Sequence, residues 1–369
     1  MKPNIIFVLL DGSRWDRLNE SPNFVKLQQN GTILNNITTA APYTFASVNA
    51  IFTGLYGKDN GVNAYYKMFR LKDSVEFLPE ILQKNGYFTS CDLISDKVIS
   101  KRGFDIYQSH NEYEDDLQLK HPQLLKESFE KANGNPIFSF LQFSRIHTVT
   151  VSEVLKHFEW DDPNYYAQKD ANMKTYDDVF NEASNYAQSI INTINELNHQ
   201  DDTILVFFAD HGTGVGERFG ERNYGVFVYE ETIRTFYLFI GPGIKKNSII
   251  SKHFSTIDIL PTILDLCSTN SISTLPGKSL EKLLTNNQDV EERSYTFSET
   301  GGLQGPFPSP KEPNVFCVKT SSHKLIYYKN IEKWELYDLL NDPLEKNNLI
   351  EKEIHIVKKL KKELLDWIS

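Results

Sequence analysis

The chain has 369 residues, enough for one large α/β unit with an appendage or for two to three smaller domains. Hydrophobic residues make up 40% and charged residues 24%, a globular mixture that excludes a disordered or collagen-like chain. The formal net charge is −10. Because such a charge repels other polyanions, nucleic acid and anionic membranes are not expected partners.

No apolar run approaches the ~20 residues that span a bilayer, and the run at residues 5–10 is too short for a secretory signal. We therefore expect a cytoplasmic protein with no stable membrane span. Cys91, Cys267 and Cys317 are odd in number and far apart, which predicts neither a disulfide framework nor a cysteine metal site. Nothing in the sequence indicates the oligomeric state.

Apolar runs alternate with helix-periodic stretches, the pattern of an α/β domain with a large, central, mostly parallel mixed sheet flanked by helices. The first run, IIFVLL, is typical of a strand buried on both faces. In chain order, strands are predicted at residues 5–10, 137–143, 203–208 and 236–240. Helices are predicted at residues 47–53, 78–85, 176–196 and 258–265, and residues 112–130 are interpreted as a solvated surface helix and loop.

The pattern changes after residue 286. Short strand candidates at residues 294–298, 315–320 and 324–328 are followed by a charged helix at residues 351–367. We expect residues 1–290 to form the main α/β domain. Residues 291–369 would form a C-terminal subdomain with a small antiparallel sheet and a terminal helix.

Three polar clusters lie where predicted strands end or a helix begins, the usual position of active sites in open α/β sheets. Asp11 follows the first strand, and Asp210 with His211 follows TILVFF. Carboxylate and imidazole ligands together suit Mn²⁺, Zn²⁺, Mg²⁺ or Ca²⁺. The alternatives are structural, since Asp11 could cap a helix and Asp-His-Gly is also a common turn.

The third cluster is the segment APYTFASVNAIFTG at residues 41–54. Thr44 and Ser47 lie where free backbone N–H groups are expected, and a nearby metal ion could lower the pKa of a hydroxyl enough to make it a nucleophile. An ordinary helix cap is the alternative role for either residue.

Six segments, in this order, resemble the sulfatase branch of the alkaline phosphatase superfamily: residues 3–18, 21–62, 207–217, 229–244, 255–266 and 334–349. The resemblance implies that Asp11, Asp210 and His211 bind one divalent metal ion. It also places Thr44 at the position of the catalytic nucleophile and metal-bound hydroxyl, because Thr53-Gly54 matches the Thr-Gly that closes the family's nucleophile helix.

The sequence departs from true sulfatases at the nucleophile. Their motif has Cys or Ser, then x-Pro-x-Arg, and the first residue is oxidised to formylglycine. Thr44 cannot give that aldehyde, and Ala46 and Val48 replace the proline and arginine. Gly12 replaces the second aspartate of the family's Asp-Asp pair. A threonine nucleophile is similar to that of phosphorus-handling relatives, namely lipoteichoic acid synthases, phosphoethanolamine transferases and nucleotide phosphodiesterases.

These resemblances favour a metal-dependent hydrolase or phosphotransferase acting on phosphoesters of the phosphodiester or phosphonate type. A formylglycine hydrate expels sulfate by collapsing to the aldehyde, whereas a threonine ester needs water or a second acceptor. The expected substrate is a small-molecule or glycan-type anionic ester. Two alternatives stay open, a sulfatase that works without formylglycine and an inactive relative that binds an anionic glycan or a partner.

Four further residues are candidates for substrate contact or proton transfer. His147 resembles the family's substrate-binding or leaving-group histidine, which could protonate a departing alkoxide, although a loop histidine is the alternative. Arg14 and Lys97 lie near positions where relatives carry an arginine and an active-site lysine, but either could instead serve as an ion-pair or surface residue. A further anion-binding position between Asp210 and Tyr229 is assigned to Arg218, with the neighbouring candidates Arg222 and Asn223.

Overall fold

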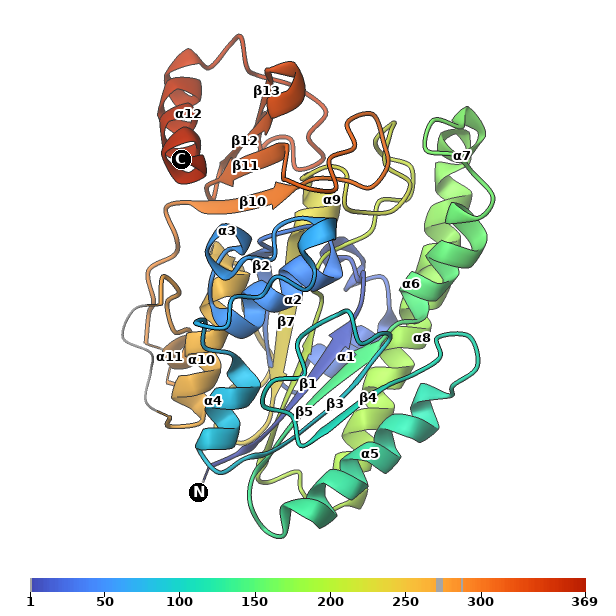
Figure 1. Ribbon diagram of the computed structural model, residues 1–369, viewed down its shortest axis with the longest axis vertical. Coiled ribbons are helices and arrows are strands. Elements are labelled where there is room, and N and C mark those ends of the chain that lie inside the picture. Colours follow the sequence, from blue (N-terminus) through green and yellow to red (C-terminus); the bar gives the residue numbers. More distant parts are fainter. Residues whose placement is uncertain (1, 270–274, 287) are drawn as a thin grey trace.

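The computed structural model describes residues 2–269, 275–286 and 288–369 (Figure 1). Across these residues the larger of two sheets has nine strands, in the order β4-β3-β5-β1-β6-β7-β2-β8, with β9 also paired to β2. The five strands from β4 to β6 in this order are mutually parallel, and β7 is antiparallel to both of its neighbours. The expected large, mostly parallel mixed sheet is therefore confirmed.

The strands of this sheet are β1 Asn4–Leu10, β2 Thr32–Thr38, β3 Phe88–Leu93, β4 Ile106–Ser109, β5 Ile137–Phe143, β6 Thr203–Phe208, β7 Arg234–Ile240, β8 Ser248–Ile250 and β9 Phe254–Ser255. The helices around it are α1 Pro22–Gln28, α2 Thr44–Thr53, α3 Gly57–Asn60, α4 Leu78–Lys84, α5 Leu117–Ala132, α6 Arg145–Val149, α7 Pro163–Ala167, α8 Lys169–Glu196, α9 Glu230–Ile233, α10 Ile259–Leu266 and α11 Glu281–Thr285.

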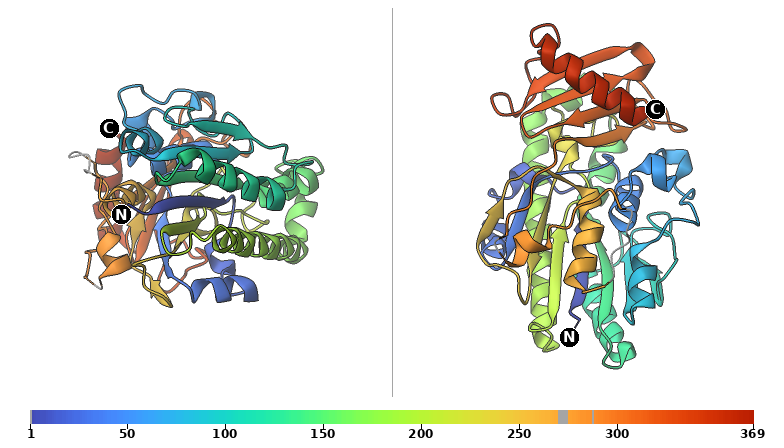
Figure 2. Two further views of the ribbon diagram at one scale, coloured as in Figure 1. Left: turned by 90° about the horizontal axis from the view of Figure 1, so that it is seen from below. Right: turned by 90° about the vertical axis from the view of Figure 1, so that its left-hand side faces the viewer.

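Strand β1 shows why the sheet is covered on both faces, because every one of its residues is buried. Alternate side chains of a strand point to opposite faces. Phe7 packs into a core with residues of α2, α4 and α10, whereas Val8 packs into a second core with residues of α1, α5 and α8. Helices cover both faces of the sheet, as Figure 2 shows from below.

The C-terminal residues form an antiparallel sheet of β10 Thr296–Thr300, β11 Val315–Lys319, β12 His323–Tyr328 and β13 Lys333–Asp338, covered by α12 Ile354–Ile368. This sheet lies at one end of the main sheet (Figure 2). The expected small antiparallel sheet and terminal helix are confirmed. Strand β13 was not predicted, and the division of the chain at residue 290 stays a prediction.

A buried charge cluster joins the C-terminal sheet to α9. Glu230 accepts from Lys319 Nζ at 2.8 Å and from Lys324 Nζ at 3.2 Å, and Lys324 also pairs with Glu345 at 2.7 Å. All four side chains are buried. Burial opposes ionisation of Glu230, but the two lysines hold the pKa of its carboxyl well below the usual range.

The prediction for residues 112–130 was wrong in one respect. Helix α5 does not lie free in solvent, because its inner face buries His121, Leu124 and Leu125 against the sheet. In the part of the chain that the structure describes, none of the helices has the length and apolarity needed to cross a bilayer. Cys91, Cys267 and Cys317 are buried free thiols.

Candidate active site

The three predicted metal ligands meet at the carboxyl ends of the neighbouring strands β1 and β6. Asp11 follows β1, while Asp210 and His211 follow β6, and all three side chains are buried. His211 Nε2 lies 3.7 Å from Asp11 Oδ1 and 3.4 Å from Asp210 Oδ2. The carboxyl ends of parallel strands lie at the same edge of a sheet. Asp11 and Asp210 therefore come together here although they are 199 positions apart in the chain.

Thr44 is the first residue of α2 and completes the group. Its Oγ1 lies 3.4 Å from Asp11 Oδ1 and 3.2 Å from His211 Nε2. The first backbone N–H groups of a helix have no intrahelical partner, so Thr44 also lies beside free donors. Ser47 is buried instead and donates to the Asp210 carbonyl at 2.8 Å, which leaves Thr44 as the hydroxyl that faces the ligands.

The ligand atoms of Asp11, Asp210 and His211 fit a divalent cation. His211 Nδ1 donates to the Gly212 carbonyl at 2.8 Å, so Nε2 carries a lone pair directed toward the two carboxylates. Asp210 Oδ2 is buried and has no hydrogen-bond partner among the described residues. Three converging acceptors in a buried site repel one another unless a cation lies between them.

Burial also sets the proton affinity of the two carboxyls. It raises the pKa of Asp210 to about 7. Burial, together with the neighbouring charge of Asp210, raises the pKa of Asp11 to about 6. The second oxygen of Asp11 accepts from Gln142 Nε2 at 2.7 Å, which orients the carboxylate. Gln142 was not predicted, although a polar residue next to the end of an apolar strand is a signal that could have identified it.

Gly12 shows why the ligand set has one aspartate fewer than the family's pair. Its φ is +73°, and a Cβ at this position would lie 2.8 Å from Thr213 Oγ1. Thr213 Oγ1 instead donates to the Gly12 carbonyl at 2.8 Å. An aspartate at position 12 would therefore need Thr213 to move, as well as a backbone conformation that favours glycine.

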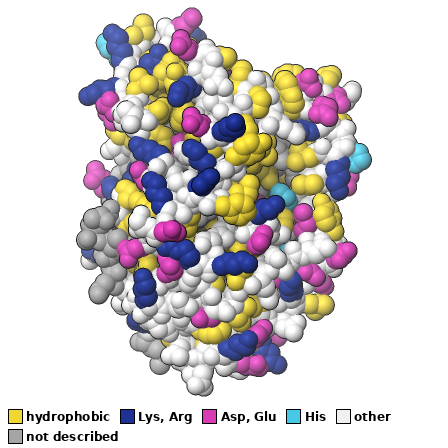
Figure 3. Space-filling view, in the orientation of Figure 1, with side chains coloured by type: hydrophobic (Ala, Val, Ile, Leu, Met, Phe, Trp, Pro, Cys, Tyr) yellow, Lys and Arg dark blue, Asp and Glu magenta, His cyan; other side chains and the backbone are white. Residues whose placement is uncertain are grey.

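A cavity of about 490 Å³ opens above Thr44. Its polar lining includes Lys97, His147, Arg222 and Asn223, and its apolar lining includes Phe45, Tyr65, Met68, Leu155, Trp160 and Leu303. Figure 3, in the orientation of Figure 1, shows hydrophobic side chains gathered near the middle of the face toward the viewer. His147 bonds the Tyr224 hydroxyl through Nδ1 at 2.7 Å, which leaves its Nε2 for other partners.

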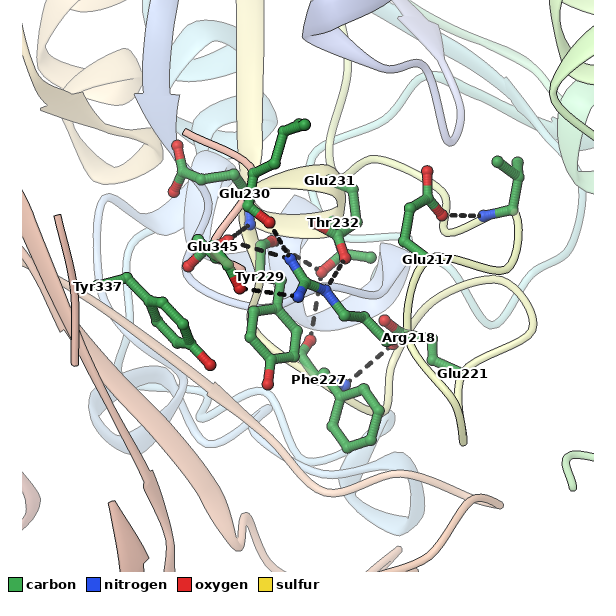
Figure 4. A network of polar contacts seen from close by, with 12 residues as sticks. Glu217, Arg218, Glu221, Phe227, Tyr229, Glu230, Glu231, Thr232, Tyr337 and Glu345 are labelled. Carbon is green, nitrogen blue, oxygen red and sulfur yellow. Dashed lines mark hydrogen bonds and ion pairs between the residues drawn. The ribbon is translucent and has the colours of Figure 1, made fainter. Parts of the chain in front are cut away.

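Arg14 and Arg218 lie away from this cavity. The Arg14 guanidinium pairs with Asp16 at 2.8 Å and with Glu217 at 2.6 Å, and only 4% of its side chain is exposed. Arg218 pairs with Glu231 at 2.8 Å and lies 3.9 Å from the centre of the Tyr229 ring (Figure 4). The substrate contacts predicted for these two arginines are not supported by these positions, because carboxylates and carbonyls already engage their donors.

Among the described residues, the cavity lining includes one arginine, Arg222, and one lysine, Lys97. Arg222 is buried and donates to the Phe158 carbonyl and to the Gln304 side chain. Spacing alone could not choose between Arg218 and Arg222, since they lie four positions apart in one irregular segment and only the fold of that segment decides which side chain turns inward.

Comparison with known proteins agrees with this geometry. A family model described as Sulfatase matches residues 3–269, which is more than two thirds of the chain. The chain belongs to the sulfatase family. A second model, N-sulphoglucosamine sulphohydrolase, C-terminal, matches residues 220–369. The resemblance inferred from the motifs is thereby confirmed at the level of the family.

Individual relatives show how far this likeness extends. An N-acetylglucosamine-6-O-sulfatase of Bacteroides thetaiotaomicron is 31% identical over 187 residues, which cover 49% of this chain and 32% of that relative. The aligned part thus spans about a third of the relative's length. A solved 2-O GAG sulfatase aligns with a TM-score of 0.82 at 20% identity, over 100% of this chain and 92% of its own. The phosphonate monoester hydrolase of Agrobacterium radiobacter aligns with a TM-score of 0.80 at 15% identity, over 99% and 95%.

Proposed function

We propose that this chain hydrolyses or transfers phosphoesters of the phosphodiester or phosphonate type, with Thr44 as the nucleophile. One divalent metal ion would be held by Asp11, Asp210 and His211. The observation that carries the proposal is the position of the Thr44 hydroxyl, 3.4 Å from Asp11 Oδ1 and 3.2 Å from His211 Nε2 at the base of the cavity.

The fold is compatible with both sulfate and phosphate ester chemistry, because it is shared with a 2-O GAG sulfatase and with a phosphonate monoester hydrolase. The nucleophile favours phosphorus. Threonine cannot become formylglycine, so its ester cannot collapse to an aldehyde and must be cleaved at the transferred group. Val48 is buried in the core, so the position of the sulfatase motif's arginine carries no cation.

The reaction proceeds in two displacements. When bound, the cation supplies positive charge that lowers the pKa of the Thr44 hydroxyl and polarises the ester. Thr44 Oγ1 gives its proton to water and forms a bond to phosphorus, and the bond from phosphorus to the alcohol oxygen breaks. His147 lines the cavity and would give that oxygen a proton, so that a neutral alcohol leaves. Water, or an acceptor hydroxyl in a transfer reaction, then attacks phosphorus and gives its proton to His147. The bond from phosphorus to Thr44 Oγ1 breaks, and this oxygen takes up a proton from water.

The cavity wall also bears on which ester binds. Lys97 lines the cavity and would contact anionic oxygens, whereas Arg222 adds positive charge to the wall while its guanidinium donates to Phe158 and Gln304. Aromatic and aliphatic side chains supply much of the remaining wall. An ester of an aryl or alkyl alcohol would bury its apolar part against residues such as Trp160 and Tyr65. We therefore assign such esters, rather than esters of small polar alcohols, as the better substrates.

A substrate panel tests this function. Aryl esters of a phosphonate, a phosphodiester, a phosphomonoester and sulfate are assayed with Mn²⁺, Zn²⁺, Ca²⁺ and Mg²⁺ in turn. The expected order places the phosphonate or phosphodiester first. Thr44→Val, which removes the hydroxyl at nearly constant volume, should lose at least ~1000-fold in kcat, whereas Thr44→Ser should retain measurable turnover.

Two results would overturn the proposal. Fastest turnover of the sulfate ester would favour a sulfatase that works without formylglycine. Absence of turnover with every ester and every metal, in protein that binds the cation, would favour an inactive binding protein.

A further inference from the structure

A second cluster of metal-ligating side chains lies at β3 and β4, and β5 separates β3 from the active-site strand β1. Asp92 is in β3, His110 directly follows β4, and His121 is in α5. All three are buried, and one ligand atom from each lies within 4.8 Å of the others. The active-site chemistry described above uses none of them.

The atoms of this cluster converge on one carboxylate oxygen. His121 Nε2 lies 3.6 Å from Asp92 Oδ1, and His110 Nδ1 lies within hydrogen-bonding distance of the same oxygen. Tetrahedral zinc with bonds of about 2.0 Å keeps neighbouring ligand atoms about 3.3 Å apart. The His121–Asp92 pair has this spacing, whereas His110 Nδ1 and Asp92 Oδ1, 2.5 Å apart, must separate by about 0.8 Å to admit the ion. Among the described residues, His121 Nε2 has no hydrogen-bond partner although it is buried and directed at Asp92.

The opposite ring nitrogens both have side-chain hydroxyls as hydrogen-bond partners. His110 Nε2 lies 2.9 Å from Ser144 Oγ, and His121 Nδ1 bonds the hydroxyl of Tyr186. The free oxygen of Asp92 accepts from Gln108 Nε2 at 2.8 Å. Each of these hydroxyls can accept from the imidazole N–H, which directs the lone pair of the other ring nitrogen at the ion.

We propose that Asp92, His110 and His121 form a second metal site that binds zinc or a similar first-row divalent transition metal. Two imidazoles with one carboxylate suit such ions better than Mg²⁺ or Ca²⁺, which prefer oxygen ligands. The ion takes the place of the proton between His110 and Asp92, and water completes its coordination. Lys120 Nζ lies 3.6 Å from the other Asp92 oxygen, but it is also held by the more exposed Asp115 at 2.8 Å.

The proposed site stabilises the position of a segment that lines the catalytic cavity. It ties the end of β3 to β4 and α5, and the backbone N–H of His110 donates to the Leu93 carbonyl at 2.9 Å. The segment that starts at Ile94 and carries Lys97 follows directly and lines the cavity. Ile94 N donates to Gln142 Oε1 at 3.0 Å, and Gln142 also orients Asp11.

Metal content of the full-length chain tests the proposal. The variant Asp11→Asn/Asp210→Asn removes two ligands of the active site, and it is treated with chelator and then equilibrated with micromolar Zn²⁺. Mass spectrometry of the metal is expected to give one zinc per chain, and adding His121→Gln should remove it. His253→Gln, at a buried histidine that bonds Thr38 and Thr296, is the control and should leave one zinc bound.

A second measurement does not depend on the folding of the His121 variant. Co²⁺ bound to Asp11→Asn/Asp210→Asn should show the visible absorption of a four-coordinate ion, and X-ray absorption should show two imidazole ligands. No bound metal in this double variant would overturn the proposal. It would also be overturned by metal that stays bound after both His110→Gln and His121→Gln. Neither result depends on which ester the active site cleaves.

Discussion

The pH dependence of metal binding at the active site follows from the burial of its two carboxyls. In the metal-free protein burial raises the pKa of Asp210 to about 7 and, with the neighbouring Asp210, that of Asp11 to about 6. Only the ionised carboxylates can bind the cation, so protons compete with it. Lowering the pH should therefore weaken binding well before an exposed aspartate would titrate.

The magnitude follows from these two values. Each pH unit below a pKa reduces the ionised fraction about tenfold. Between pH 8 and pH 5 this gives about 100-fold for Asp210 and about 10-fold for Asp11, or about 1000-fold in apparent affinity together. The same two pKa values also fix how the stability of the metal-free protein changes with pH. Both folded-state values exceed the unfolded value of 3.8, so metal-free protein loses stability as the pH rises toward about 7.

Isothermal titration with Mn²⁺ measures this effect at half-unit steps of pH, in a His121→Gln background so that only the active site is counted. Thermal unfolding gives an independent readout, since the rise in Tm on adding metal should grow from pH 5 to pH 8. An apparent affinity that changes less than tenfold over this range would refute the assignment of these carboxyls as ligands.

Three further outcomes are expected. Lys97→Met should raise KM for an anionic aryl ester about five- to tenfold in steady-state kinetics. Lys101→Met is the control, because Lys101 is exposed and lies outside the cavity lining, and this change should leave KM unchanged. Trp160→Ala should lower kcat/KM for an aryl phosphonate about tenfold but leave a methyl phosphonate ester unaffected, and equal losses for both esters would argue against the apolar wall as a leaving-group site. Lys324→Met removes a cation that pairs with the buried carboxylates of Glu230 and Glu345. In a denaturant titration it should lower the free energy of unfolding by about 3–5 kcal/mol. Lys329→Met, at an exposed lysine, should lower it by less than about 0.5 kcal/mol.

Local sequence patterns were enough to predict the elements that position the metal ligands. The run IIFVLL is apolar throughout because β1 is covered on both faces, and the polar residue that follows it lies at the sheet edge. The same holds for TILVFF and Asp210. The pattern thus placed Asp11, Asp210 and His211 at strand ends, and the resemblance to sulfatases implied that they form one metal-binding group.

The cavity wall could not be predicted in this way. Arg218 and Arg222 lie in one irregular segment, and tertiary contacts set the direction of each side chain. Arg218 contacts Glu231, and Arg222 contacts Gln304, which is far along the chain. His121 lay in a stretch that was predicted to be a solvated helix and loop, yet helical periodicity turns it inward. Such contacts are set by tertiary packing, which a single sequence does not record.

The central claim is that an unmodified Thr44 carries the transferred group. Rapid quenching of the enzyme with an aryl phosphonate ester, followed by peptide mass spectrometry, tests it most directly. We expect the phosphonyl mass on the peptide that contains Thr44, fragment ions that place it on this residue, and its loss in Thr44→Val. Turnover that continues with no adduct in the burst phase, or an adduct on another residue such as Ser47, would contradict the account.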